Sequence, residues 1–265
     1  YLFTGMRATP ELSYAVRELN AIGGIVVTAS HNPPEYNGYK VYWEDGGQVV
    51  PDQARDIIAE IEEIDDFSIV KTMDEMEAVN QGLLNYIGAE IDESYQKTLI
   101  DILPDTDLAK EKGKDLSVVY TPLHGTGSTV IPDLLGNLGF SNLHVVEEQA
   151  DGDSNFSTVE SPNPEDREAF ELALKLAKKE DAELIIATDP DCDRMAPAVR
   201  DSNGDYQFLN GNETGVLFAD FLLKSKNEAG TLPDNGAIIK SIVSTDMVMD
   251  IAADYGVEVL DVLTG

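Results

Sequence analysis

Short apolar runs rich in β-branched residues alternate with amphipathic stretches along nearly the whole chain. The runs at 23–27, 117–120 and 183–188 have the length and composition of buried strands. The segment 163–179 instead repeats apolar residues at helical spacing. Strands that alternate with helices form sheets whose two faces are covered by helices. The sequence therefore predicts an α/β fold made of consecutive three-layer α/β/α domains with mixed or parallel sheets.

Turn and cap signals set the expected boundaries of these elements. We expect strands at 1–3, 23–27, 41–43, 117–120, 143–146, 183–188, 195–199, 237–243 and 257–262. We expect helices at 51–64, 91–103, 128–139, 163–179, 211–224 and 246–255. A further helix is expected to start with Thr9 as N-cap and Pro10 as its first residue, and to end at Gly23-Gly24. Residues 105–115 are expected to form a charged loop.

A loop with the sequence TASHNPPEYNGYK, residues 28–40, follows directly on the strand-like run 23–27. Its two prolines cannot continue a central strand, so Ser30 is expected on a stiff loop at the C-terminal end of that strand. His31 lies beside this serine, and Lys40 can turn back toward it. A serine in such a setting is a candidate nucleophile or phosphate carrier. The alternative is a surface loop that the prolines merely terminate.

A second loop, DPDCDR at residues 189–194, follows the run 183–188. Asp189, Asp191 and Asp193 alternate along it, and they converge if the loop curls. Clustered carboxylates are hard oxygen ligands of the kind that Mg²⁺ prefers. Arg194 then offers a planar guanidinium to a phosphate group. The alternative is a solvated acidic turn in a very acidic chain.

Charge and composition narrow the classes of function. The net charge is −32, from 50 acidic and 18 basic residues, which opposes binding to nucleic acid and to anionic membranes. The single cysteine, Cys192, excludes an internal disulfide framework. The sequence contains neither an apolar run of membrane-spanning length nor a recognisable signal peptide. We therefore expect a soluble cytoplasmic protein that binds neither nucleic acid nor membrane, whose few bases near the two loops matter for any anionic substrate.

The two loops together resemble the α-D-phosphohexomutase family. The segments TPLHGTG at 121–127 and SPNPE at 161–165 resemble two further family stretches in the same order. The motifs are most similar to the branch of phosphoglucomutases and phosphopentomutases. The resemblance implies a domain I at 1–92 that lacks its N-terminal part, a domain II at 93–205, an incomplete domain III at 206–265 and no domain IV. It therefore also implies that the sequence is truncated at both ends.

The resemblance implies an activity as well. Family members interconvert glucose 1-phosphate and glucose 6-phosphate through a phosphoserine and a bisphosphorylated sugar, with Mg²⁺ as cofactor and glucose 1,6-bisphosphate as activator. Two alternatives remain open: a mutase for mannose or pentose phosphates, and a non-catalytic fragment that binds a phosphosugar or a metal. The partner in each enzymatic case is a phosphorylated sugar, and the oligomeric state is open. Without a fourth domain, the chain alone is expected not to complete the cycle.

The resemblance also assigns roles to individual residues. Ser30 would carry the phosphoryl group and, with Asp189, Asp191 and Asp193, bind the metal. Ser30, His31 and Lys40 would be catalytic, with Lys40 as the favoured base. The expected phosphate-binding residues are Arg194, Asn32 and His124. On the residues alone, the glycines at 125 and 127 favour a tight strand-to-helix turn over a phosphate contact.

Overall fold

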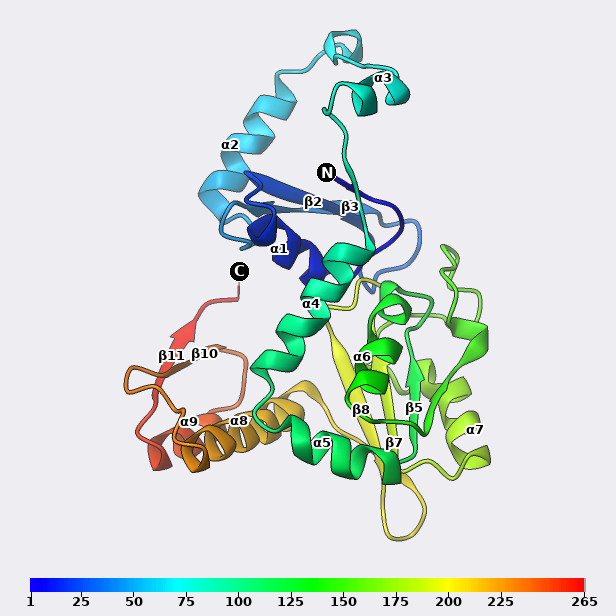
Figure 1. Ribbon diagram of the computed structural model, residues 1–265, viewed down its shortest axis with the longest axis vertical. Coiled ribbons are helices and arrows are strands. Elements are labelled where there is room, and N and C mark those ends of the chain that lie inside the picture. Colours follow the sequence, from blue (N-terminus) through cyan, green and yellow to red (C-terminus); the bar gives the residue numbers. More distant parts are fainter. Residues whose placement is uncertain (265) are drawn as a thin grey trace.

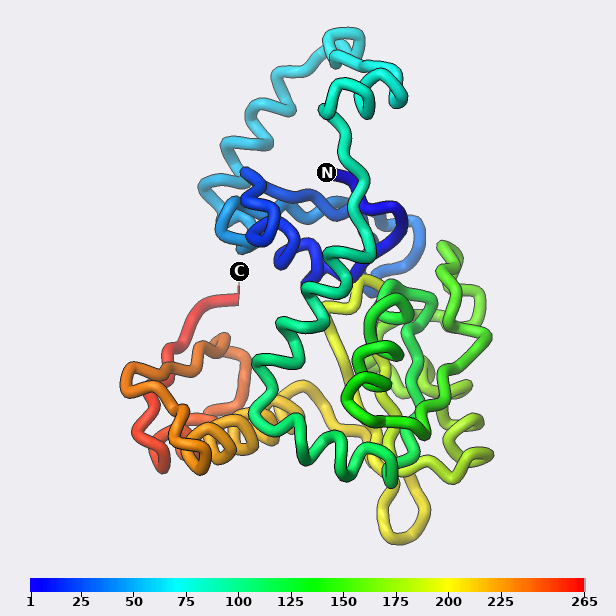
Figure 2. Tube along the Cα trace, viewed as in Figure 1, coloured from blue at the N-terminus to red at the C-terminus, as the bar shows by residue number. Residues whose placement is uncertain are grey.

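The computed structural model describes residues 1–264, which form three successive regions (Figure 1). An N-terminal region, drawn in blue and cyan, lies above a central region in green and yellow, and a C-terminal region is drawn in orange and red. The chain passes through each region once, and the long helix α4 (Ala89–Ile102) connects the first region to the second (Figure 2). The predicted α/β fold with mixed sheets is confirmed, since sheets and helices alternate throughout.

The central region is built on a five-stranded sheet with the strand order β6-β5-β7-β8-β9. β5 is parallel to β6 and β7, whereas β7–β8 and β8–β9 are antiparallel. The strands are β5 (Val118–Thr121), β6 (Leu143–Val145), β7 (Leu184–Thr188), β8 (Met195–Arg200) and β9 (Tyr206–Phe208). The helices of this region are α5 (Thr106–Lys112), α6 (Ile131–Asn137) and α7 (Glu171–Lys179).

The main hydrophobic core lies between this sheet and α7. Small alanines on α7 let the helix pack closely on β5 and β7, whose β-branched residues fill the interface. Fully buried members of this core are Val119, Phe170, Ala173, Ala177, Ile185 and Ala198. The C-terminal ends of β5 and β7, where two of the sequence motifs follow, are therefore rigidly supported.

The N-terminal region contains two small sheets. β2 (Gly23–Thr28) pairs antiparallel with β3 (Gly38–Trp43), and β1 (Leu2–Phe3) pairs parallel with β4 (Tyr86–Ile87). Its helices are α1 (Thr9–Glu18), α2 (Pro51–Glu62) and α3 (Glu75–Asn80). No residue of α2 is buried.

The C-terminal region is a single βαβ unit preceded by a helix. α8 (Gly211–Glu228) leads to β10 (Ala237–Ser241), α9 (Met247–Asp254) and β11 (Glu258–Val262). The two strands are parallel neighbours, as a crossover through a helix requires. Among the described residues, none of the helices combines the length and the apolarity that a membrane span needs.

Several expected elements differ from the observed ones. The predicted loop 105–115 contains α5, because the Asp105 side chain accepts the Leu108 N–H at 2.7 Å and caps a helix. The predicted helix 163–179 starts only at Glu171; Asn163 instead accepts the Glu165 N–H, and a 3₁₀ turn intervenes. The predicted helix 128–139 likewise begins only at Ile131, after another 3₁₀ turn.

The first helix also has different ends from those predicted. Ala8 is its N-cap, and Thr9 is the first helical residue. The chain leaves the helix at Asn20, which adopts φ 50°, a left-handed conformation that asparagine tolerates. Gly23 and Gly24 consequently belong to β2 and not to the helix end. The strand β9 was not among the expected elements.

An acidic residue is buried where α1 meets α4. Glu11 is 1% exposed, and Arg7 lies between it and Asp92, contacting the Asp92 carboxylate through two nitrogens at 2.6 and 2.8 Å. Burial and the neighbouring Asp92 together raise the pKa of Glu11 to about 8, although Arg7 acts in the opposite direction. Folded chains therefore keep Glu11 protonated at neutral pH, whereas unfolded chains ionise it near its ordinary pKa of 4.5.

This difference predicts a pH-dependent stability. Because the folded pKa is the higher one, the contribution of Glu11 is fully favourable below about pH 4.5 and is lost as the pH rises toward 8. Glu11→Gln should therefore gain stability relative to the parent chain between pH 5 and 8.5, by about 1–3 kcal/mol. Urea unfolding of Glu11→Gln and of the parent chain, at pH 5 and at pH 8.5, measures this gain in the free energy of unfolding. Glu93→Gln on the exposed side of α4 is the control, and an equal difference at both pH values would contradict the prediction.

Candidate active site

The loop after β2 holds Ser30 in a strained turn. Ser30 has φ 52°, an uncommon value for a residue with a side chain. Its N–H donates to the Thr28 hydroxyl at 2.7 Å, and the Asn32 N–H donates to the Ala29 carbonyl at 3.1 Å. These bonds turn the chain sharply at the strand end and leave the Ser30 hydroxyl at the edge of the N-terminal region. Strain of this kind tends to gather at functional sites.

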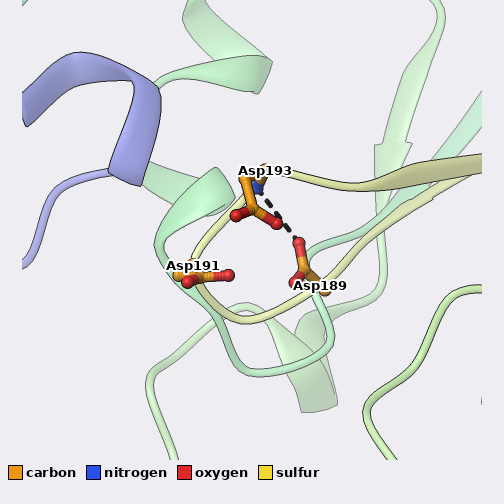
Figure 3. Close-up of side chains that lie close together, drawn as sticks. All are labelled: Asp189, Asp191 and Asp193. Atoms are coloured by element: carbon orange, nitrogen blue, oxygen red, sulfur yellow. Dashed lines mark hydrogen bonds between the residues drawn. The ribbon is translucent and has the colours of Figure 1, made fainter. Parts of the chain in front are cut away.

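The loop between β7 and β8 is folded around Asp189. The Oδ1 atom of Asp189 accepts the N–H groups of Asp193 at 3.1 Å and Arg194 at 2.9 Å. Cys192, with φ 57°, lets the loop curl back on itself. Figure 3 shows the result: the carboxylates of Asp189, Asp191 and Asp193 converge, with one oxygen of each within 4.8 Å of the others. The sequence prediction that these three side chains converge is thus confirmed.

The two loops meet although they are about 160 residues apart. The Ser30 Oγ lies 3.4 Å from Asp189 Oδ2 and 3.4 Å from Asp191 Oδ1, with separations of 159 and 161 residues in sequence. On its other side the Ser30 hydroxyl lies 3.3 Å from His31 Nδ1. The structure therefore brings together four of the residues that the sequence predicted.

Backbone contacts from both regions fix the carboxylate loop. The Thr9 N–H, at the start of α1, donates to the Asp191 carbonyl at 2.8 Å. Thr126, which follows β5, donates its N–H at 2.8 Å and its hydroxyl at 3.1 Å to the Pro190 carbonyl. Neither threonine was predicted to contact this loop, because backbone N–H donors are common to nearly all residues and the Thr126 hydroxyl bonds to a loop 64 residues away.

The carboxylate cluster is electrostatically unfavourable by itself. Burial raises the pKa of Asp189 well above its usual range, and the neighbouring Asp191 raises it further. Burial acts in the same direction on Asp191, but hydrogen bonds from Lys40, Asp189 and Thr9 and the charge of Lys40 together hold the pKa of Asp191 below its usual value. Converging oxygens in a partly buried loop are the donor set that a divalent cation requires. The chemistry of the site therefore fits Mg²⁺, and Asp189, Asp191 and Asp193 are the residues that could hold it.

Lys40 lies on β3 opposite Val26 of β2. Its Nζ is 2.8 Å from Asp191 Oδ2 and 2.7 Å from Asp193 Oδ2. Burial tends to lower the pKa of Lys40, but the two carboxylates raise it above the ordinary value. In this arrangement Lys40 is a charged partner of the carboxylates. Its role as a base stays a prediction, since it must first lose these contacts.

The three expected phosphate-binding residues have different surroundings. Arg194 is exposed at the end of the loop, and its guanidinium makes no hydrogen bond within residues 1–264. The Asn32 amide donates to the Ala29 carbonyl and is exposed. His124 is only 6% exposed, and its ring nitrogens contact Thr158 Oγ1 at 2.8 Å and the Asp151 carbonyl at 3.2 Å. Both ring nitrogens of His124 are thus engaged in hydrogen bonds. A phosphate contact by any of the three residues stays a prediction.

The two glycines of the TPLHGTG segment are sites of close approach. A Cβ atom at Gly125 would lie 2.3 Å from the Cα of Pro190, which is backbone of the carboxylate loop. At Gly127 a Cβ would lie 2.1 Å from the Tyr120 hydroxyl. Contacts this short cannot be accommodated without movement. The glycines therefore let the turn after β5 lie directly against the carboxylate loop.

This close approach predicts the effect of adding one methyl group. Gly125→Ala should lower the free energy of unfolding by about 1–3 kcal/mol through overpacking and, because Pro190 lies between Asp189 and Asp191, also weaken Mg²⁺ binding. Gly136→Ala in α6 is the matched control, since no atom lies within 4 Å of its new Cβ. It should gain up to about 1 kcal/mol. Denaturant unfolding and calorimetry compare the two, and equal behaviour would contradict the prediction.

A cleft of about 1520 Å³ opens beside Ser30 between the N-terminal and central regions. Ser30 and Asp191 are among the residues that line it, and His124, Thr126 and Phe156 line it from the central region. The cleft is open to solvent, so a small polar molecule can reach the Ser30 hydroxyl. The fold and this site together define a multidomain α/β protein whose serine and carboxylate loops meet at a domain junction.

Comparison with known proteins identifies the family. Family models for phosphoglucomutase/phosphomannomutase alpha/beta/alpha domains I, II and III match residues 1–67, 93–204 and 210–265 in that order. The chain belongs to this phosphoglucomutase/phosphomannomutase family of α-D-phosphohexomutases. The order of the three domains was predicted; the exact boundaries at 92 and 205 stay predictions.

Individual relatives agree with this assignment. The chain is 40% identical over 265 residues to phosphoglucomutase of Staphylococcus haemolyticus strain JCSC1435, covering 100% of this chain and 46% of that protein. It is 38% identical over 268 residues to phosphoglucomutase of Staphylococcus aureus strain MRSA252, covering 100% and 46%. The chain thus spans about half the length of the curated relatives it matches.

A solved structure shows the same fold. A phosphoglucomutase/phosphomannomutase family protein from Burkholderia thailandensis superposes with a TM-score of 0.69 at 24% identity, over 98% of this chain and 51% of that one. At this level of identity the likeness concerns the fold alone.

Proposed function

We propose that this chain contains the phosphoryl-transfer centre of a phosphoglucomutase, in which Ser30 accepts a phosphoryl group from a bisphosphorylated glucose and returns it to a glucose phosphate. The observation that carries the proposal is the position of the Ser30 hydroxyl, 3.4 Å from both Asp189 and Asp191 and open to a cleft. Relatives at 38–40% identity that are named phosphoglucomutase support glucose as the sugar.

Asp189, Asp191 and Asp193 would hold Mg²⁺, whose charge would offset the negative charge of a phosphoryl group at Ser30. The triad fits this role because two of its members are buried and Asp189 is already oriented by two backbone N–H groups. Phosphoryl transfer depends mainly on positioning and on charge neutralisation. The rigid support of the carboxylate loop by β7 and β8 serves both requirements.

The serine must lose its proton when its oxygen bonds to phosphorus. In this step the Oγ–P bond forms, the P–O bond to the sugar breaks, and the released sugar oxygen takes up a proton. His31 Nδ1, at 3.3 Å from the Ser30 Oγ, is the neighbouring ring nitrogen that can accept the serine proton. Lys40, which the family resemblance favours as the base, can take this role once it is free of Asp191 and Asp193.

Cations near the site counteract the charge of the rest of the molecule. The net charge of −32 repels an anionic sugar phosphate at long range. Arg194 has a free guanidinium at the end of the carboxylate loop, which suits a phosphate contact. Asn32, beside the Ser30 turn, offers an amide only if it gives up the Ala29 carbonyl. His124 borders the same cleft and would act at a distance from Ser30.

The proposal is tested by offering donors to the 265-residue chain. With glucose 1,6-bisphosphate and Mg²⁺, intact-mass spectrometry should detect one phosphoryl group per chain. The bisphosphates of mannose and ribose, offered in parallel, should transfer more slowly. Faster transfer from one of them would favour that sugar, and no transfer from any donor would favour a fragment that only binds phosphosugar or metal.

A further inference from the structure

The contacts of Lys40 point to a role that differs from proton transfer. Its ammonium bridges two of the three clustered carboxylates, at 2.8 Å from Asp191 and 2.7 Å from Asp193. Within residues 1–264 it is the only cation in contact with the triad. The Asp193 carboxylate has no other hydrogen-bond donor among these residues. Lys40 therefore contacts two of the three carboxylates that a metal ion would bind.

We propose that Lys40 is a built-in counter-ion that holds Asp191 and Asp193 in place when the triad carries no metal, and that Mg²⁺ binding displaces it. The inference rests on the proposed function in one respect, since it takes the triad as the metal site. Under this proposal Lys40 positions the two carboxylates before the metal binds. When the metal binds, the ammonium leaves them and turns toward Ser30.

Geometry supports displacement over coexistence. One oxygen of each carboxylate lies within 4.8 Å of the others, and oxygens around Mg²⁺ sit about 2.0–2.1 Å from the ion, so an ion bound by all three would lie close to the ammonium. The ammonium contacts one oxygen of Asp191 at 2.8 Å and one of Asp193 at 2.7 Å, and it therefore competes with a metal for these two carboxylates. Two cations within one small, partly buried cluster also repel each other strongly.

The side chain of Lys40 has room to move. It is 22% exposed, and it borders a second small cavity together with Ser30, Asn32 and Tyr36. Released from the carboxylates, the ammonium can therefore turn toward the space beside the Ser30 hydroxyl. There it would meet a phosphoryl group carried by Ser30, so metal binding and phosphate contact by Lys40 would be coupled.

Calorimetric titration of Mg²⁺ into three forms of the 265-residue chain tests the proposal. Lys40→Met removes the competing charge, so its dissociation constant for Mg²⁺ should fall by about tenfold relative to the parent chain. Lys178→Met, on the exposed side of α7, changes the net charge equally and should leave the constant unchanged. Lys40→Arg keeps the charge and should not show the gain.

A second measurement uses the parent chain and does not depend on how the variant folds. Amine labelling with an N-hydroxysuccinimide ester, followed by peptide mass spectrometry, reports how freely each lysine reacts. Lys40 should be labelled faster with Mg²⁺ than without it, while Lys178 should be labelled equally in both cases. If the parent chain binds Mg²⁺ but neither Lys40→Met nor the labelling responds, the inference is overturned and the metal site stands. If no form binds Mg²⁺, the metal site fails and the inference with it.

Discussion

Ser30→Gly is expected to abolish the transfer of a phosphoryl group from glucose 1,6-bisphosphate to the chain. Loss of an essential nucleophile typically costs on the order of 10⁴-fold or more in rate, because no other oxygen occupies its position. Glycine is the appropriate replacement, since the site requires φ 52°, which glycine adopts without strain. Alanine would remove the same oxygen but would add backbone strain to the turn.

Incorporation is measured by the intact mass of the chain after incubation with the donor and Mg²⁺. Ser68→Ala, which removes an exposed hydroxyl far from the carboxylate loop in sequence, is the control and should incorporate as the parent does. Retained incorporation in Ser30→Gly, with an unchanged far-ultraviolet spectrum, would show that another residue receives the phosphoryl group.

Asp191→Asn is expected to weaken Mg²⁺ binding by about 100-fold or more. The substitution keeps the shape of the side chain but replaces a charged ligand oxygen with a neutral amide, and even changes in groups that only orient metal ligands cost about 10–100-fold. Asp191 also lies 3.4 Å from Ser30 and is nearly buried, so it is placed to bind a metal beside the Ser30 hydroxyl.

Calorimetry measures this loss directly. Asp220→Asn, at an exposed position in the middle of α8, changes the net charge by the same amount and should bind as the parent does. The asparagine also loses its ion pair with Lys40, so the unfolding of Asp191→Asn should be followed in parallel. A fully folded Asp191→Asn chain with unchanged affinity would place the metal elsewhere.

The parts of the fold that could be predicted are those set by local sequence. β7 is a run of buried aliphatic residues that ends in a loop of alternating aspartates, and both the strand and the convergence of Asp189, Asp191 and Asp193 follow from that pattern. The boundaries of helices were less predictable. Asn163 has the side chain of a helix cap, yet it caps only a turn, because the following residues form a 3₁₀ segment first.

The parts that could not be predicted depend on contacts between regions. Nothing in the sequence near Lys40 indicates that it pairs with Asp191 and Asp193, which are 151 and 153 residues away. The hydrogen bond from the Thr9 N–H to the Asp191 carbonyl could not be predicted either, since every residue but proline has this donor. For Gly125 the sequence favoured a tight turn, whereas the requirement for glycine arises from Pro190 in a distant loop.

The central claim is that Ser30, set against the aspartate triad, carries the phosphoryl group. Peptide mass spectrometry of the chain after incubation with glucose 1,6-bisphosphate, with Mg²⁺ and with a chelator in its place, tests it most directly. A single phosphate is expected, located on Ser30 and present in quantity only with Mg²⁺. Phosphate on any other residue with Ser30 unmodified, or equal modification of Ser30 in the presence of the chelator, would contradict it.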